Sequence, residues 1–121
     1  IKFWWLDNRD YNDWEEEGKD ITRLAALHWR HNIEEITKQA KILPKNRYLI
    51  IRYEEFTEDP MINFKKIIEF CGLDWNEQFR DVLKNTNFEN RNFKWKENLT
   101  PSQKAILDDV LSDTLIQLGY K

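Results

Sequence analysis

The sequence predicts an α/β fold that is mostly helical, with one buried parallel-sheet strand near residues 47–53. Three observations predict it. Apolar residues recur at helical spacing over residues 24–40, an uninterrupted apolar run fills residues 48–51, and an Asp-Pro pair typical of a helix start follows that run. Because the run does not alternate between apolar and polar residues, we expect helices to cover both faces of its sheet.

The first half of the chain is expected to hold a loop and one long helix. Residues 7–19 are polar and acidic, and we expect them to form the loop. Asp20 is placed to cap a helix that ends before Pro44. The apolar face of this helix is expected to consist of Leu24, Ala25, His28, Trp29, Ile33, Ile36 and Ala40.

A second helix should begin directly after the strand. Asp59 stands before Pro60, which places an acidic cap ahead of a proline in the first helical position. Gly72 suits the left-handed residue that ends a helix. Residues 75–84 predict a further short helix. The apolar face of the helix after Pro60 is expected to consist of Phe64, Ile67, Ile68 and Cys71.

The end of the chain predicts a loop and a last helix. Residues 85–98 are polar, basic and aromatic, and we expect a loop there. Thr100 and Gln103 have the spacing of a capping box, and Gly119 is placed to close the helix that they open. A single strand cannot form a sheet, so its partner strands are expected from a missing portion of the protein or from another chain.

Composition narrows the classes of function. The length of 121 residues suits one domain, and 40% hydrophobic with 34% charged residues is typical of a globular protein. A net charge of −3 argues against general duplex binding through a basic face. The single cysteine, Cys71, allows no intrachain disulfide and no cysteine-based zinc cluster, and three glycines provide no phosphate-cradling glycine-rich loop.

Three segments resemble the sulfotransferases that depend on 3′-phosphoadenosine 5′-phosphosulfate (PAPS). Residues 48–75, YLIIRYEEFTEDPMINFKKIIEFCGLDW, are similar to the family's strand ending in Arg-Tyr-Glu-Asp-Leu, its following proline and its helix ending in Phe-Leu-Gly-Leu. Residues 85–91, NTNFENR, resemble the family's Thr-Ser-Phe segment. Residues 94–121 resemble the family's end, where a Trp-Lys or Trp-Arg pair precedes a Leu-Thr helix cap and a final Leu-Gly-Tyr.

This resemblance implies a fold and a binding site. It implies that residues 1–121 are a single partial domain, the C-terminal part of a P-loop-type three-layer sulfotransferase fold whose N-terminal phosphosulfate-binding part is absent. Tyr53 would lie beside the adenine of PAPS, where Thr86 and Phe88 would complete the adenine site. Arg91 and Lys94 would meet the 3′-phosphate, although the family's usual Arg-Lys-Gly is replaced here by Arg-Asn-Phe-Lys.

The resemblance also implies an activity that this chain serves only in part. The expected enzyme moves a sulfuryl group from PAPS, its co-substrate, to an acceptor hydroxyl or amine of a small molecule or carbohydrate, without a metal. This chain would supply the adenine and 3′-phosphate side and no catalytic residue, so it would be inactive alone. The expected partner is the N-terminal half of the same enzyme or a companion chain. No nucleic-acid partner and no transmembrane segment are expected, and the expected location is the cytoplasm.

Two other functions remain open from the sequence. The chain fits a non-catalytic helical interaction module derived from the sulfotransferase fold. It also fits half of another P-loop transferase, such as a small-molecule kinase. The segments at residues 85–91 and 94–121 favour the sulfotransferase over the kinase.

Individual residues have structural interpretations as well. A tyrosine at a strand end, such as Tyr53, is commonly a half-buried packing residue. The basic residues Arg91, Lys94 and Lys96 can belong to a solvated loop. Glu54 and Glu55 would point to opposite faces of a strand, which favours capping or ion pairing over acid–base chemistry. His28 and His31 lie three residues apart without an evident third ligand, so helix packing or surface exposure is favoured over a metal site.

Overall fold

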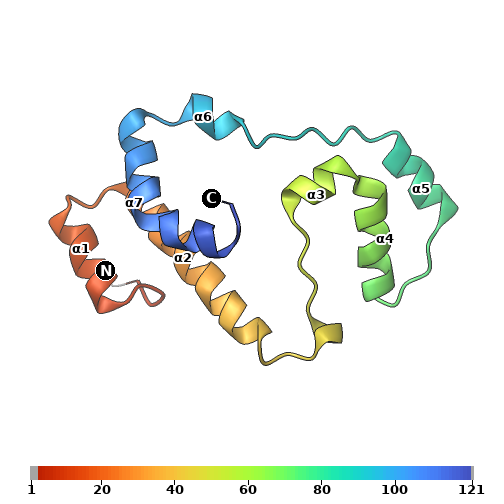
Figure 1. Cartoon of the computed structure of the whole chain (residues 1–121), viewed down its shortest axis with the longest axis horizontal. Coiled ribbons are helices and arrows are strands. Elements are labelled where there is room, and N and C mark those ends of the chain that lie inside the picture. Colours follow the sequence, from red (N-terminus) through yellow and green to blue (C-terminus); the bar gives the residue numbers. More distant parts are fainter. Residues whose placement is uncertain (1–2, 121) are drawn as a thin grey trace. The chain divides into compact units, whose positions relative to one another are not determined.

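The computed structural model describes residues 3–120, and every regular element in that range is a helix (Figure 1). The chain forms two compact units. One combines the chain up to Ile42 with the chain from Asn98 onward, and the other is Leu43–Glu97. The elements are α1 (Asn8–Glu16), α2 (Ile21–Ala40), the 3-10 helix η1 (Lys45–Arg47), α3 (Tyr53–Glu58), α4 (Pro60–Phe70), α5 (Glu77–Lys84), α6 (Lys94–Asn98) and α7 (Pro101–Gln117).

The strand predicted near residues 47–53 is wrong, and so are the parallel sheet and the three-layer α/β fold, because residues 3–120 contain no strand. The backbone is extended at Tyr48 (φ −145°, ψ 126°) and at Arg52 (φ −79°, ψ 138°). A strand also needs hydrogen bonds to a neighbouring strand, and the described part of the chain offers no such neighbour. Tyr53 begins a helix, and Glu54 and Glu55 lie in its first turn.

The loop predicted over residues 7–19 is also wrong, because most of it forms α1. The side chain of Asp7 caps this helix by accepting a hydrogen bond from the amide of Asp10 at 2.8 Å. Trp14 is buried, and its indole Nε1–H donates to the carbonyl of Asp20 at 2.8 Å. Burial of Trp14, with Tyr11 packed beside it, therefore outweighs the many polar residues of the segment.

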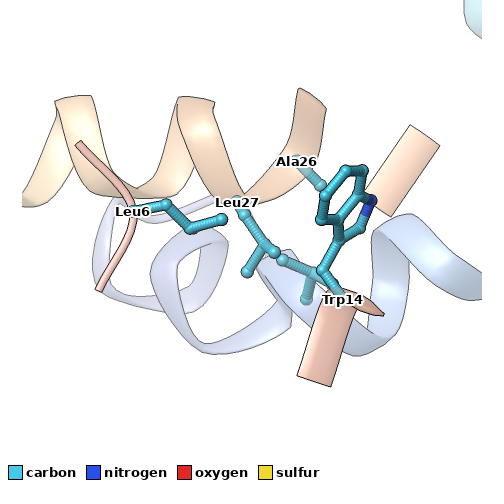
Figure 2. Packing of buried hydrophobic residues seen from close by; sticks show 5 residues of the cluster. Leu6, Trp14, Ala26 and Leu27 are labelled. Atoms are coloured by element: carbon cyan, nitrogen blue, oxygen red, sulfur yellow. The ribbon is translucent and has the colours of Figure 1, made fainter. Parts of the chain in front are cut away.

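The unit that contains both ends of the chain has a small apolar core between its helices. α2 packs against α1 and α7. Figure 2 shows Leu6 and Trp14 pointing toward Ala26 and Leu27 of α2. The predicted apolar face of α2 is wrong in part, because Ala26 and Leu27 are buried while Trp29 and Ile36 are exposed. The buried core residues are Leu6, Trp14, Ala26, Leu27 and Val110.

The unit Leu43–Glu97 is organised by the junction of α3 and α4. Asp59 is both the C-cap of α3 and the N-cap of α4, and its carboxylate accepts from the amide of Ile62 at 3.0 Å. Asn63 is only 3% exposed. Its side-chain amide donates to the carbonyls of Glu55 and Asp59, both at 2.9 Å. One buried asparagine therefore ties the end of α3 to the first turns of α4.

Most predicted helix boundaries are confirmed. The carboxylate of Asp20 caps α2 by accepting from the amide of Arg23 at 2.9 Å. Gly72 and Gly119 have positive φ values of 68° and 78° directly after their helices. The loop predicted over residues 85–98 is wrong at its end, where α6 forms. The expected single partial domain over residues 1–121 stays a prediction.

The capping box of α7 gives a direct test of the fold. The hydroxyl of Thr100 accepts from the amide of Gln103 at 3.2 Å, and the Gln103 side chain accepts from the amide of Thr100 at 2.9 Å. Thr100→Ala should lower the free energy of unfolding by about 1 kcal/mol, measured by urea denaturation. Ser102→Ala, an exposed position in the same turn outside the box, is the control. Equal midpoints for the two variants would contradict a stabilising role of the box.

Candidate functional site

Two residues at the start of α3 hold the segment before α6. The hydroxyl of Tyr53 donates a hydrogen bond to the carbonyl of Glu89 at 3.1 Å and accepts one from the amide of Arg91 at 3.2 Å. The side-chain amide of Asn92 donates to Oε1 of Glu54 at 2.8 Å. Residues 89–92, which we call the site loop, therefore lie against the first turn of α3.

Four phenylalanine rings form a cluster whose last member directly precedes the site loop in the sequence. They come from α3 (Phe56), α4 (Phe64), α5 (Phe79) and the segment after α5 (Phe88). The ring centroids of Phe56 and Phe64 are 5.0 Å apart, and those of Phe64 and Phe79 are 5.4 Å apart. Phe88 lies 5.6 Å from Phe56 and 6.0 Å from Phe64. Three of these pairs are edge-on and the pair of Phe64 and Phe88 is tilted. Such distances and angles are favourable for aromatic pairs, so Phe88 is held in place by packing.

A pocket opens where α3 meets the site loop. It has a volume of ≈ 390 Å³. Three of the five residues predicted for nucleotide binding lie in its wall, namely Tyr53, Phe88 and Arg91. The full lining is Tyr53, Phe56, Thr57, Asn87, Phe88, Glu89 and Arg91.

The other two predicted residues lie elsewhere. Thr86 lines a neighbouring pocket of ≈ 430 Å³ that shares Thr57 and Phe88 with the first. Its hydroxyl donates to the carbonyl of Val82 at 2.8 Å, at the end of α5. Lys94 is the exposed first residue of α6 and lines neither pocket, although its amide donates to the carbonyl of Arg91 at 3.1 Å.

The charge in the first pocket is available to a ligand. The Arg91 side chain is 63% exposed, and its Nη2 lies 3.5 Å from a carboxylate oxygen of Glu89. Exposed pairs of this kind contribute little, so an anionic group can replace Glu89 as the partner of the guanidinium. A half-buried ring, Phe88, lies in the same wall. The pocket therefore suits a ligand that combines a flat aromatic group with an anionic group.

The sequence missed the contributions of Glu54, Glu89 and Asn92 to this site. Glu54 was expected in a capping or ion-pairing role, and it accepts from an amide 38 residues further along the chain. No local pattern predicts a contact between side chains so far apart. Glu89 contributes its backbone carbonyl to Tyr53, which depends on the fold and not on residue type.

A polar pocket in the other unit is structural. It has a volume of ≈ 210 Å³ between α1, α2 and α7. Arg23 pairs with Asp109 at 2.9 Å, and Arg30 pairs with Asp10 at 2.5 Å. These ion pairs connect the three helices. The charged groups of this pocket therefore stabilise the packing of its walls.

The candidate metal residues do not come together. Within residues 3–120 no group of three or more histidine, cysteine or acidic residues is arranged to hold a metal ion. His28 is exposed, and its ring lies 4.4 Å from the ring of Trp5. No helix in the described part of the chain is both long and apolar enough to cross a membrane.

A comparison with known protein families shows to which family the chain belongs. A model of the sulfotransferase family matches residues 6–77, which is more than half of the 121 residues. The chain belongs to the sulfotransferase family, and its function is of the sulfotransferase type. The match includes Tyr53, while Thr86, Phe88, Arg91 and Lys94 follow it in the chain. No curated protein and no solved structure matches the chain.

The aromatic cluster under the pocket can be tested by one substitution. Phe64→Leu keeps an apolar side chain but loses two edge-on ring contacts and one tilted ring contact. We expect the free energy of unfolding to fall by about 1–3 kcal/mol, measured by chemical denaturation. Phe70→Leu, an exposed position on the same helix, should change it by less than about 0.5 kcal/mol. Equal losses in the two variants would show that the cluster adds nothing specific.

Proposed function

We propose that this chain binds the adenine and 3′-phosphate end of PAPS in an enzyme that transfers a sulfuryl group to an acceptor hydroxyl or amine. The observation that carries the proposal is the shared pocket of Tyr53, Phe88 and Arg91 in a member of the sulfotransferase family. An aromatic ring beside an exposed guanidinium is the combination that a nucleotide with an extra phosphate requires.

Each residue has a proposed role. Phe88 stacks on the adenine, the ring of Tyr53 forms an adjacent wall, and the hydroxyl of Thr86 hydrogen-bonds to the base from the neighbouring pocket. Arg91 binds the 3′-phosphate through its planar fork of donors. Lys94 lines neither pocket, so its contribution to phosphate binding is expected to be smaller than that of Arg91.

The chemical step belongs to another part of the enzyme. In sulfuryl transfer, an acceptor oxygen or nitrogen forms a bond to sulfur while the bond from sulfur to the bridging phosphate oxygen breaks. A base takes the acceptor proton, and 3′-phosphoadenosine 5′-phosphate leaves. With three glycines and no phosphate-cradling loop, this chain relies on an N-terminal half or companion chain for those groups. The acceptor class is proposed to be a small molecule or carbohydrate.

One observation favours a second candidate function. Large apolar side chains of the unit Leu43–Glu97 are exposed, including Ile50 at 70%, Leu73 at 60% and Val82 at 60%. Such side chains suit a non-catalytic interaction module that binds a partner protein. They equally suit coverage by the companion part of the enzyme, so nucleotide binding is the property that separates the two functions.

The phosphate role of Arg91 is tested with two nucleotides. The full protein that contains this chain should bind 3′-phosphoadenosine 5′-phosphate more tightly than adenosine 5′-phosphate. Arg91→Ala should weaken binding of the first by about 10- to 150-fold, because a charge-assisted contact is worth about 1.5–3 kcal/mol, and should leave the second nearly unchanged. Isothermal titration measures both.

The control is Arg80→Ala. Arg80 is a half-buried arginine that pairs with nearby carboxylates, those of Glu77 and Asp81, and it lines neither pocket of the site. Its loss should leave both affinities unchanged. If Arg91→Ala preserved the preference for the 3′-phosphate, the site loop would not be the phosphate site.

The stacking role of Phe88 predicts a different pattern. Phe88→Ala should weaken both nucleotides by the same factor, about 5- to 150-fold, because stacking on a base is worth about 1–3 kcal/mol and is blind to the 3′-phosphate. Phe93→Ala removes an exposed ring outside the pocket and serves as the control. A loss confined to 3′-phosphoadenosine 5′-phosphate would argue against stacking.

A further inference from the structure

We infer that Tyr53, Glu54 and Asn92 form a clasp that positions Arg91 and Phe88, so that these three side chains set nucleotide affinity without needing to touch the phosphate. The inference deepens the proposed function and rests on it. We call the three residues the loop clasp. It joins two neighbouring residues at the start of α3 to both sides of Arg91.

The first half of the clasp is the hydroxyl of Tyr53. Its single proton is donated to the carbonyl of Glu89 at 3.1 Å, and its oxygen accepts from the amide of Arg91 at 3.2 Å. One hydroxyl therefore satisfies two backbone groups that lie two residues apart in the site loop. This fixes the direction of the backbone on which the Arg91 side chain is mounted.

The second half is the contact between Glu54 and Asn92. It is partly buried, and its length of 2.8 Å is typical of a hydrogen bond to a carboxylate. It lies one residue after Arg91, while the Glu89 carbonyl lies two residues before it. The loop also bonds to itself, because the amide of Asn92 donates to the side-chain oxygen of Asn90 at 2.9 Å. Arg91 is thus held from both sides.

The site loop needs such anchors. It lies outside any helix, and each residue of an irregular segment loses conformational entropy when it is ordered. If the loop were free, a nucleotide would have to order it on binding and would lose affinity for that reason. A loop already held against α3 presents its guanidinium and the adjacent Phe88 ring at no such cost.

In the loop clasp, the hydroxyl of Tyr53 positions the site loop and does not bind the base. Both of its hydrogen-bonding functions are engaged with the loop. A tyrosine that only lined the pocket would be replaced by phenylalanine with little effect. If the hydroxyl of Tyr53 positions the loop, the variant Tyr53→Phe should lower both the order of the loop and the affinity for the nucleotide.

The first arm of the test needs no nucleotide. In the full protein, amide hydrogen exchange at Arg91 should become about 2- to 10-fold faster in Tyr53→Phe, the factor expected for loss of one net hydrogen bond. Glu55→Ala is the control, since Glu55 shares the first turn of α3 with Glu54 but lies outside the clasp. Unchanged exchange at Arg91 in Tyr53→Phe would overturn the clasp.

The second arm measures binding of 3′-phosphoadenosine 5′-phosphate by titration. Tyr53→Phe, Glu54→Ala and Asn92→Ala should each weaken it by about 2- to 10-fold. The double variant of Glu54 and Asn92 should lose no more than the worse single variant, because both changes remove the same contact. Glu54→Gln should restore most of the affinity, since its amide oxygen still accepts from Asn92.

The outcomes separate this inference from the proposed function. Faster exchange together with weaker binding and rescue by Glu54→Gln supports the clasp. Faster exchange with unchanged affinity, or additive losses in the double variant, overturns the positioning role while nucleotide binding stands. If the unmodified protein showed no preference for 3′-phosphoadenosine 5′-phosphate over adenosine 5′-phosphate, the proposed function would fail, and the positioning role with it.

Discussion

The phenolic hydroxyl of Tyr53 is the contact on which the candidate site depends. It is the point where α3 meets the site loop, and both of its hydrogen-bonding functions are used there. Without it, the carbonyl of Glu89 and the amide of Arg91 would lose their hydrogen bonds to α3. With it, a ring, a guanidinium and a tyrosine form one pocket wall. The chemistry of the site therefore follows from the position of the loop.

The two units achieve stability by different means. The unit that contains α1, α2 and α7 combines a small apolar core with ion pairs of Arg23 and Arg30. The unit Leu43–Glu97 has few buried residues and relies on edge-on phenylalanine pairs and on the buried amide of Asn63. The match to the sulfotransferase family ends at residue 77. Phe88 and Arg91 are therefore assigned to the candidate site because of their contacts.

The sequence predicts local features well and distant ones poorly. The caps at Asp20, Asp59 and Thr100 are confirmed because each involves a side chain and an amide three residues away. The strand near residues 47–53 is wrong because a strand depends on a partner that no local pattern can supply. Tyr53, Phe88 and Arg91 were expected at one site from family resemblance. The contact between Glu54 and Asn92 could not be expected, because it spans 38 residues.

The shared cap at Asp59 has a consequence for the evolution of this segment. Because α3 ends and α4 begins at the same residue, no spacer separates them. The torsion angles of Asp59 (φ −136°, ψ 81°) therefore set how far one helix is rotated relative to the other. One residue inserted within α3 would turn everything before it by about 100° around the helix axis. Tyr53 would then face away from its loop. The number of residues between Tyr53 and Pro60 is therefore expected to be fixed.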